Sequence, residues 1–438
     1  MVRQLLRKYV IRYLFGKLFF RQEIKAKKLL VISFLALLIS IFFLQLGSSI
    51  LAPFDALAGL EIGFTNVELG LLGSSHFAGF LIGCWIAPFI MGRVGHIRAF
   101  TIFASFSVLG SVMHPLIINP FFWCFLRVLA GISIAGCFTI AEGWLNAKVS
   151  NLNRGRVFGS YRFVDHGGAA LGSIFIGLLD TENLLTYNVI GVFLCLCILP
   201  LAFTSNIPPT IPKAPSLNIV KAFKLSPLSF VSVFVVGATN PSIRMVGPIY
   251  GAERGFSSLE VGIFLSLALV GGVIAQIPLG FVADKFDRRL VLIFLSFASL
   301  LCCFLISLFG DRNFFLFSAF VFLFSFFALP IFSVAAAYAN DFSDDTFFID
   351  LAASLIFIYG ISAILSPLIV STLFEIFGSG ILFVYIGFIH LSLCIFGFYR
   401  MTIRPSNEAK QPYLILPRTS FVFLKMFARK KTEKNKDL

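Results

Sequence analysis

Four ionisable residues lie in two neighbouring apolar stretches of the chain, where charged side chains are costly. Glu142 precedes a short polar loop by about as many residues as Arg162 follows it, so two antiparallel helices would bring both side chains to a similar depth. Asp165 lies at i+3 from Arg162 and could compete for its guanidinium. His166 adjoins Asp165 but should point roughly 100° around the helix. An acid that exchanges its partner can carry a proton; alternatively, Glu142 and Arg162 form a structural clamp.

A second candidate site lies in a later apolar stretch, which Asn240 and Pro241 interrupt about halfway along. Proline removes a helical hydrogen bond, and irregular backbone at mid-membrane depth is tolerated where it lines a cavity. Arg244 follows one turn later, so Asn240 and Arg244 could bind an anionic or polar group of a solute. Alternatively, Arg244 pairs with Asp55 or Glu253.

Three further polar residues, Gln45, His76 and Gln276, are weaker candidates for the same cavity, since such residues more often satisfy a helix contact. The chain contains no nucleophile elbow, phosphate-binding loop or metal-ligand constellation. Its eight cysteines fall in apolar stretches without a Cys-x-x-Cys pair, which favours buried small side chains over metal ligands or disulfides. The sequence therefore predicts neither an enzyme nor a bound cofactor or metal.

Membrane-spanning helices are the elements expected to position these residues. Of 438 residues, 58% are hydrophobic and 13% are charged, whereas a soluble domain carries about 25% charged residues. Stretches of roughly 20 apolar residues, the length that crosses the hydrocarbon core, occur twelve times once one long stretch is divided at Asn119 and Pro120. The predicted spans are 29–53, 69–91, 99–117, 121–142, 157–179, 186–204, 228–249, 259–281, 290–309, 314–338, 350–372 and 381–399.

The chain also contains an internal repeat with an offset of 192 residues. The sequence GFTNVELG (63–70) aligns without a gap on GFSSLEVG (255–262), and Gly92-Arg93 falls on Asp284-Lys285. Duplication within apolar sequence is typical of transporters built from two parallel repeats. The predicted fold is therefore an all-α membrane protein with twelve transmembrane helices in two parallel six-helix repeats.

The distribution of basic residues predicts the orientation. If the N-terminus is cytoplasmic, the segments on its side hold 30 Lys and Arg residues and the opposite loops hold two. Both termini are therefore expected in the cytoplasm, and the net charge of +14 requires no nucleic-acid partner. The predicted parts are a basic amphipathic segment (1–28), a six-helix bundle (29–204), a cytoplasmic linker (205–227), a second bundle (228–400) and a basic tail (401–438). Both basic ends are expected to contact anionic lipids.

These features resemble the major facilitator superfamily. The loop GFVADKFDRR, which ends in Arg288 and Arg289, resembles the family's signature loop, and Arg127 with Gly131 resembles its span-4 Arg-x-x-x-Gly motif. More narrowly, AEGWLN, NRGRVFGSYR and QIPLGFVADKFDRR resemble the YcaD-like bacterial branch. The resemblance implies a monomeric transporter whose halves rock about a central cavity. Arg127 would either face that cavity or bond near the first helix.

The resemblance also implies that the signature Asp closes a gate between the two halves. In the first copy Gly92 stands at that position, while an acidic loop precedes the eleventh span. One hypothesis is that the gate's charges have exchanged sides. The acids of this loop, Asp341, Asp344, Asp345 and Asp350, would then face Arg93, His96 and Arg98. Alternatively, these acids form a solvated loop, because exposed ion pairs contribute little.

In the second copy the signature Asp is present as Asp284. The family's symmetry implies that it approaches the start of the fifth span, near Arg154 and Arg156. Four glycines of that span predict close approach by other helices, namely Gly159, Gly167, Gly168 and Gly172.

The resulting interpretation is a secondary active transporter of the bacterial inner (plasma) membrane that works by alternating access. No ATP-binding motif is present, so an ion gradient or the solute's own gradient would drive it, with protons on Glu142 and Asp165 preferred. Arg162 and Arg244 favour an organic acid, amino acid or similar metabolite, whereas a Phe-rich lining would suit export of an amphipathic drug. The alternative is a non-transporting membrane receptor or assembly scaffold, which the long basic ends favour.

Overall fold

The computed structural model describes residues 2–148, 154–204, 217–310, 313–343 and 347–403. These residues form helices joined by short loops, with no strand among them, which confirms the predicted all-α class. The N-terminal half contains α1 (Val2–Glu61), α2 (Asn66–Val94), α3 (His96–Val112), η1 (His114–Leu116), α4 (Pro120–Lys148), α5 (Arg154–Phe175), η2 (Ile176–Leu178), α6 (Thr186–Leu196) and α7 (Leu199–Ala202). The remainder contains α8 (Ile219–Leu225), α9 (Pro227–Glu253), α10 (Ser258–Lys285), α11 (Arg288–Phe309), α12 (Phe314–Ala328), α13 (Ile331–Asn340), α14 (Phe348–Phe377) and α15 (Ile381–Ile403).

Ten segments of the described chain are long and apolar enough to cross a membrane. The other two predicted spans correspond to α5, which carries Arg162 and Asp165, and to the shorter apolar pair α6 and α7, which separates next to Pro200. The predicted division before Pro120 is present, because Asn119 Oδ1 accepts hydrogen bonds from the first amides of α4. The chain is therefore a multi-pass integral membrane protein.

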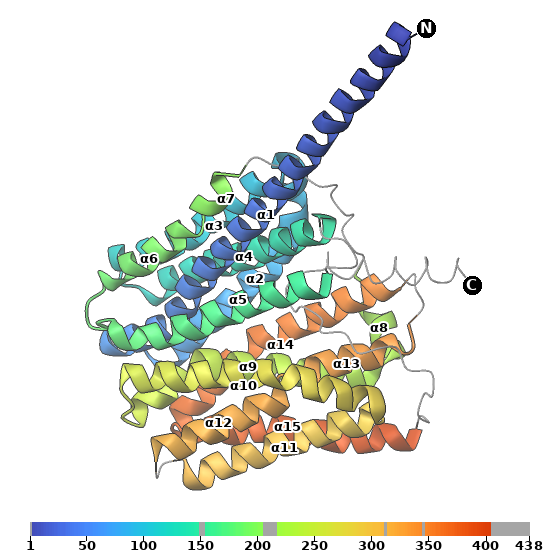
Figure 1. Ribbon diagram of the computed structural model, residues 1–438. Coiled ribbons are helices and arrows are strands. Elements are labelled where there is room, and N and C mark those ends of the chain that lie inside the picture. Colours follow the sequence, from blue (N-terminus) through green and yellow to red (C-terminus); the bar gives the residue numbers. More distant parts are fainter. Residues whose placement is uncertain (1, 149–153, 205–216, 311–312, 344–346, 404–438) are drawn as a thin grey trace.

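The two halves of the chain form two bundles with the same internal arrangement (Figure 1). In the first bundle α1 packs on α5, α2 on α4 and α3 on α6. In the second, the equivalent helices pair in the same way: α9 with α14, α10 with α12 and α11 with α15. The bundles meet through α2 against α14 and α5 against α10, which are also equivalent pairs. This arrangement confirms the predicted parallel duplication.

The repeated sequence builds the same turn twice. Gly63 has a φ of 86°, a conformation that favours glycine. Thr65 then caps α2, because its hydroxyl accepts from the amide of Glu68 while the Glu68 carboxylate accepts from the amide of Thr65. The second copy repeats these features at Gly255, Ser257 and Glu260. The residues that the two copies share therefore form a turn followed by a capping box.

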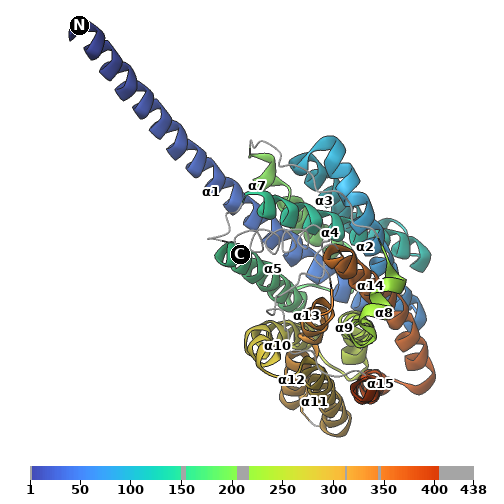
Figure 2. The ribbon, with the colours of Figure 1, turned by 90° about the vertical axis from the view of Figure 1, so that its right-hand side faces the viewer.

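The loops define two ends of the molecule. We call the end where α15 finishes the proximal end, and the end that carries the α1–α2 and α9–α10 turns the distal end. The helix α1 is continuous from Val2, and its first part projects beyond the bundles (Figure 2). Side chains of residues 2–30 and the tail from 404 lie outside the described part, so the predicted lipid contacts of the basic ends stay predictions. The described portion of the predicted linker contains α8.

Glycines bring α2 and α4 into close contact. A Cβ at Gly131 of α4 would overlap the carbonyl oxygen of His76, and one at Gly79 of α2 would overlap the carbonyl oxygen of Val128. No side chain fits at either position without moving backbone. Gly131, identified above in the span-4 motif, therefore permits a helix crossing.

The glycines of α5 divide into two groups. Gly168 and Gly172 lie against the α1 backbone at Phe42 and Leu46, as predicted for close helix approach. A Cβ at Gly159 or Gly167 would meet nothing within 4 Å. The prediction of close contact is therefore wrong for these two glycines, which face open space.

The predicted interruption at Asn240 and Pro241 is wrong, because α9 runs through both residues as one helix. The hydroxyls of Ser242 and Ser366 both donate to the Ala238 carbonyl beside the proline, which provides hydrogen bonds where the helix is weakened. A break at mid-depth occurs instead in the tenth span, where α12 ends before and α13 begins after Pro330.

Candidate functional site

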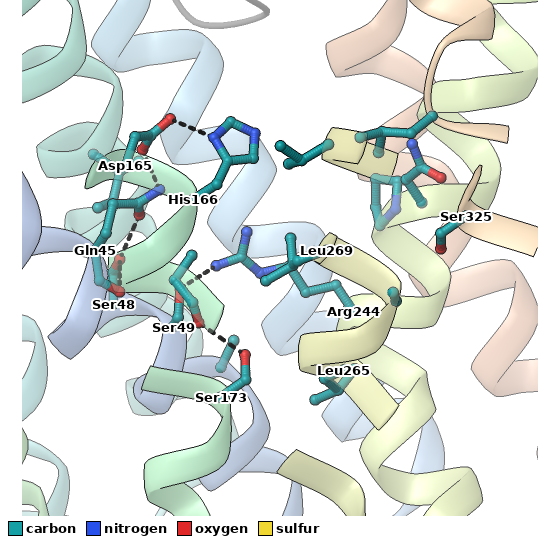
Figure 3. Close-up of a pocket in the computed structure, with 18 of the residues that line it drawn as sticks. Gln45, Ser48, Ser49, Asp165, His166, Ser173, Arg244, Leu265, Leu269 and Ser325 are labelled. Atoms are coloured by element: carbon teal, nitrogen blue, oxygen red, sulfur yellow. Dashed lines mark hydrogen bonds and ion pairs between the residues drawn. The ribbon is translucent and has the colours of Figure 1, made fainter. Parts of the chain in front are cut away.

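A cavity of about 590 Å³ lies between the two bundles. Its walls come from α1, α2, α4 and α5 on one side and from α9, α10, α12, α13 and α14 on the other. The break between α12 and α13 contributes to the wall through Leu329, with Ser325 and Ser333 on either side of it. Most lining residues are apolar, and a small set of charged and amide side chains projects among them (Figure 3). Such a composition is typical of a small-molecule site.

The halves touch at the distal end. The Val67 amide donates to the Glu375 carboxylate at 3.3 Å. Gly70 packs against α14, and Gly262 of α10 packs against the Ser173 carbonyl of α5, in both cases without room for a Cβ. These contacts close the cavity on its distal side, while its lining continues towards the proximal end.

Arg162, which lies on that lining, bonds to two carboxylates. Its Nη2 donates to Glu142 Oε1 at 3.2 Å and its Nη1 donates to Asp165 Oδ2 at 3.0 Å. Glu142 is fully buried and also lies 3.5 Å from the hydroxyl of Tyr161. The predicted ion pair is therefore present, but Arg162 bridges both acids at once. Two negative groups share one guanidinium.

Asp165 has further partners in the same network. Gln45 Nε2 donates to Asp165 Oδ1 at 2.6 Å, and Gln45 Oε1 accepts from Ser48 (Figure 3). His166 Nδ1 lies 3.3 Å from Asp165 Oδ2 and 3.1 Å from the Arg162 carbonyl oxygen. The expectation that His166 points away from Asp165 is therefore wrong, and Gln45 belongs to the charged site.

Arg244 reaches from α9 to the opposite bundle. Its Nη2 donates to Ser49 Oγ of α1 at 3.1 Å (Figure 3). Among the described residues Arg244 forms no ion pair, and both alternative partners, Asp55 and Glu253, bind other side chains. A guanidinium that lines a cavity and has only a neutral hydroxyl partner can bind an anion.

The remaining polar candidates also line the cavity. The buried atoms His76 Nδ1 and Asn240 Nδ2 lack a hydrogen-bond partner within the described ranges, so a solute could supply one. Gln276 accepts from Ser333 at 3.3 Å across the second bundle. Within the same ranges no group of three or more His, Cys, Asp or Glu side chains could hold a metal ion.

A second buried charge cluster lies distal to this site, at the edge of the cavity. Arg127 Nε lies 3.5 Å from Asp55 Oδ2, and both side chains are 2% exposed. Tyr187 donates to Asp55 Oδ1 at 2.8 Å, and His114 Nε2 lies 3.6 Å from Oδ2. Arg127 also contacts the sulfur of Met245 in the opposite bundle at 3.6 Å. Arg127 therefore both lines the cavity and binds α1.

Sequence reasoning named Asp55 only as a possible partner of Arg244 and missed the cluster. The predicted first span ended at residue 53, whereas α1 continues to Glu61 and so includes Asp55. Asp55 lies six residues before the end of α1, and Arg127 lies seven residues after the start of α4. Asp55 and Arg127 therefore lie at a similar depth in neighbouring helices, as Glu142 and Arg162 do.

The signature loop forms several ion pairs and hydrogen bonds within the second bundle. Arg288 is 1% exposed and bonds to Asp284 at 2.9 Å, to Asp341 at 2.6 Å and to the carbonyl oxygens of Ala283 and Ala337. Arg289 pairs with Asp287 and is also buried. These bonds hold α11 to the end of α13.

The predicted gate between the halves stays a prediction. Gly92, Arg93, Arg98 and Lys285 are exposed at the proximal end, and Arg93 lies over the Phe89 ring at 4.2 Å. Asp344 and Asp345, and the side chains of residues 154 and 156, lie outside the described part of the chain.

Comparison with known proteins agrees with the family resemblance that the sequence motifs indicate. A family model described as the Major Facilitator Superfamily matches residues 37–256 and 225–432. Two relatives from strains of Escherichia coli, both named "Uncharacterized MFS-type transporter YcaD", are 25% and 24% identical over 333 residues. Each alignment covers 75% of this chain and 86% of the relative.

Solved structures share the fold at low identity. The structure of the nucleoside transporter NupG superimposes with a TM-score of 0.71 at 12% identity and covers 86% of this chain and 100% of its own. The D-xylose-proton symporter has a TM-score of 0.64 at 15% identity, with 87% and 99% covered. At these identities the structures show the architecture alone.

Proposed function

The chain belongs to the major facilitator superfamily and is a secondary transporter rather than an enzyme, and we propose that it moves a small solute with a negative group, coupled to protons, by alternating access through the cavity between its halves. The observation that carries the proposal is Arg244, a cavity-lining cation with a neutral partner only. An organic acid or an amino acid carries the group that it would bind.

The neighbouring polar groups fit this solute class. Asn240, from the same helix as Arg244, and His76, from the opposite side of the cavity, offer further hydrogen-bonding atoms. A carboxylate at Arg244 would replace the neutral Ser49 hydroxyl with an anionic acceptor that can pair with the guanidinium through two parallel hydrogen bonds. Binding would therefore release the contact between α9 and α1.

Proton coupling is assigned to the Arg162 network. Glu142 and Asp165 both bond to the Arg162 guanidinium, and His166 Nδ1 lies beside Asp165. A buried charge without a partner is strongly disfavoured, so any movement of Arg162 towards one acid would favour protonation of the other. The competing explanation is a structural clamp that fixes α4 to α5.

Because the cavity is closed at its distal end, solute binding and proton exchange would start from a state that is open towards the proximal end. With the termini in the cytoplasm of a bacterium, as the basic residues predict, the cavity would face inward. The contacts of Gly70 and Gly262 would then separate when it faces outward. Each half would move largely as a rigid body, because its helices pack mostly against helices of the same bundle.

A solute screen with purified protein tests the anion site. Thermal stabilisation by organic acids, amino acids and their uncharged analogues would be compared, since a ligand at 100 times its Kd adds about 2.7 kcal/mol. Acids should stabilise the native chain and should lose this effect in Arg244→Ala but not in Arg93→Ala, which removes an exposed Arg. Stabilisation by uncharged analogues alone, or an unchanged response in Arg244→Ala, would contradict the proposal.

Proteoliposome transport tests the coupling site. In Glu142→Gln or Asp165→Asn, uptake driven by an imposed proton gradient should fall at least about tenfold, while solute exchange without a gradient should persist. A clamp predicts a different result, namely loss of both activities together with a lower melting temperature. Gradient-driven uptake equal to the native rate in both variants would exclude these acids as carriers.

A further inference from the structure

The two sides of the cavity differ in how far their lining residues are exposed. On the side of α2 and α14, Phe80 and Tyr359 line the cavity and are 6% and 8% exposed. Leu81 of α2 packs on Gly360 of α14 without room for a Cβ, which closes this side at mid-depth. On the side of α5 and α10, Phe163 and Ile277 line the same cavity and are 80% and 66% exposed.

The contact between α5 and α10 described above lies towards the distal ends of both helices. Gly262 and Ser173 meet there, whereas Gly159 and Gly167, one turn before and one turn after Phe163, face open space. The contact at Gly262 and Ser173 is therefore distal, and open space adjoins α5 on both sides of Phe163 along the helix.

The exposed residues lie at the depth of the hydrocarbon. Phe163 is nine residues from the proximal end of α5 and Ile277 is eight from that of α10, which corresponds to about 12–14 Å along each helix. The hydrocarbon core is about 30 Å thick, so both side chains lie near its middle. Exposed apolar residues continue along the same face of α10 at Ile274 and Phe281.

We propose that the cavity opens sideways into the bilayer between α5 and α10, and that its solute is an amphipathic anion whose apolar part passes through this opening while its charged group binds Arg244. The class of solute rests on the proposed function; the opening does not. Large apolar side chains at mid-depth would be disfavoured beside a water-filled gap but are compatible with acyl chains. Arg244 supplies the complementary charge.

Fluorescence quenching in lipid nanodiscs tests the opening. Bimane would be attached to Phe163→Cys in a background with Cys195→Ser, which removes the exposed native cysteine among the described residues. Quenchers would be a nitroxide-labelled phosphatidylcholine from the lipid and iodide from water. Leu171→Cys, an exposed α5 residue outside the cavity, serves as the lipid control, and Leu269→Cys serves as the cavity control.

The label at residue 163 should respond to both quenchers, whereas the label at 171 should respond to nitroxide and the label at 269 to iodide. Quenching at residue 163 by iodide alone would mean an aqueous mouth closed to lipid, and quenching by nitroxide alone would mean a wall without an opening. No quenching by either agent would mean a packed side chain. Each of these three results overturns the opening, whether or not the chain transports an anion.

Competition at the cavity label tests the solute class. Octanoate should protect the label at 269 from iodide at concentrations at least about tenfold below those needed for acetate, since burial of even two methylenes strengthens binding about tenfold. Octyltrimethylammonium should not protect. Equal potency of acetate and octanoate would overturn the amphipathic class. Protection by octanoate that persists in Arg244→Ala would overturn the anion site, and hence the proposed function, while leaving the opening intact.

Discussion

Removing the charge of Arg127 should destabilise the protein far more than removing both charges of its pair with Asp55. The two groups are 3.5 Å apart and each is 2% exposed. Their attraction is about 5 kcal/mol at an effective dielectric constant of 20. Loss of one partner leaves the other buried without compensation, which costs about 3–5 kcal/mol, whereas replacement of both is often close to neutral.

A double-mutant cycle measures this difference. The variants are Arg127→Met, Asp55→Asn and their combination, and Arg93→Met is the control for loss of an exposed Arg. Unfolding by SDS in mixed micelles can be followed through Trp123, whose ring lies 4.8 Å from that of His114 in the cluster. Each single variant should lose about 3–5 kcal/mol, the combination about 0–2 kcal/mol and the control less than about 0.5 kcal/mol.

The additive result would refute the reasoning. If the combination loses the sum of the two single losses within about 0.5 kcal/mol, Asp55 and Arg127 do not stabilise each other. An Arg127→Met variant with the native free energy of unfolding would mean that Tyr187 and His114 are sufficient partners for the Asp55 carboxylate.

Three further changes have expected outcomes. Gly131→Leu should abolish folded protein in size-exclusion chromatography, because its Cβ would overlap backbone, whereas Gly159→Leu in open space should fold with an unchanged elution profile. Thr65→Ala should cost about 1 kcal/mol in the same SDS titration through loss of the α2 cap, and a neutral result would mean that the Glu68 half of the box suffices. Arg288→Met should lower the melting temperature more than Lys285→Met, because Arg288 is buried on Asp341 and Lys285 is exposed; equal shifts would argue against a structural role for Arg288.

Much of the fold was predictable, because the length of each apolar stretch predicts a membrane-spanning helix and the internal repeat predicts two equivalent halves. The bundles, the turn at Gly63 and the division before Pro120 follow from local sequence. The status of Pro241 and Pro330 did not. Pro241 stays inside α9, where Ser366 of another helix donates to the nearby Ala238 carbonyl, while Pro330 separates α12 from α13. A contact from a distant segment is not visible in local sequence.

The charged groups show the same limit. Glu142 and Arg162 could be paired from depth alone, because a short loop fixes the register of their two helices. Arg288 was identified only as part of the signature loop, and its burial was not predicted, since hydropathy records its charge and not its buried partners. His166 was expected to face away from Asp165, but rotation about its side-chain bonds brings Nδ1 to 3.3 Å from the carboxylate. The position of a residue along a helix predicts the direction of its Cα–Cβ bond, but it does not predict where the end of a flexible side chain lies.

The charges at the cavity are unequally divided between the halves, and this division bears on coupling. Asp165 on the cavity wall and Glu142, which also binds Arg162, belong to the first bundle, whereas Arg244 belongs to the second. A ligand shifts a conformational equilibrium only through its differential affinity for the two states. A solute anion on Arg244 can therefore influence protons on the first bundle only if it spans the cavity or breaks the Arg244–Ser49 bond that joins the halves. If so, Arg244→Ala and Asp165→Asn affect one shared step. In that case, the combined variant should reduce gradient-driven uptake no further than the more severe single change.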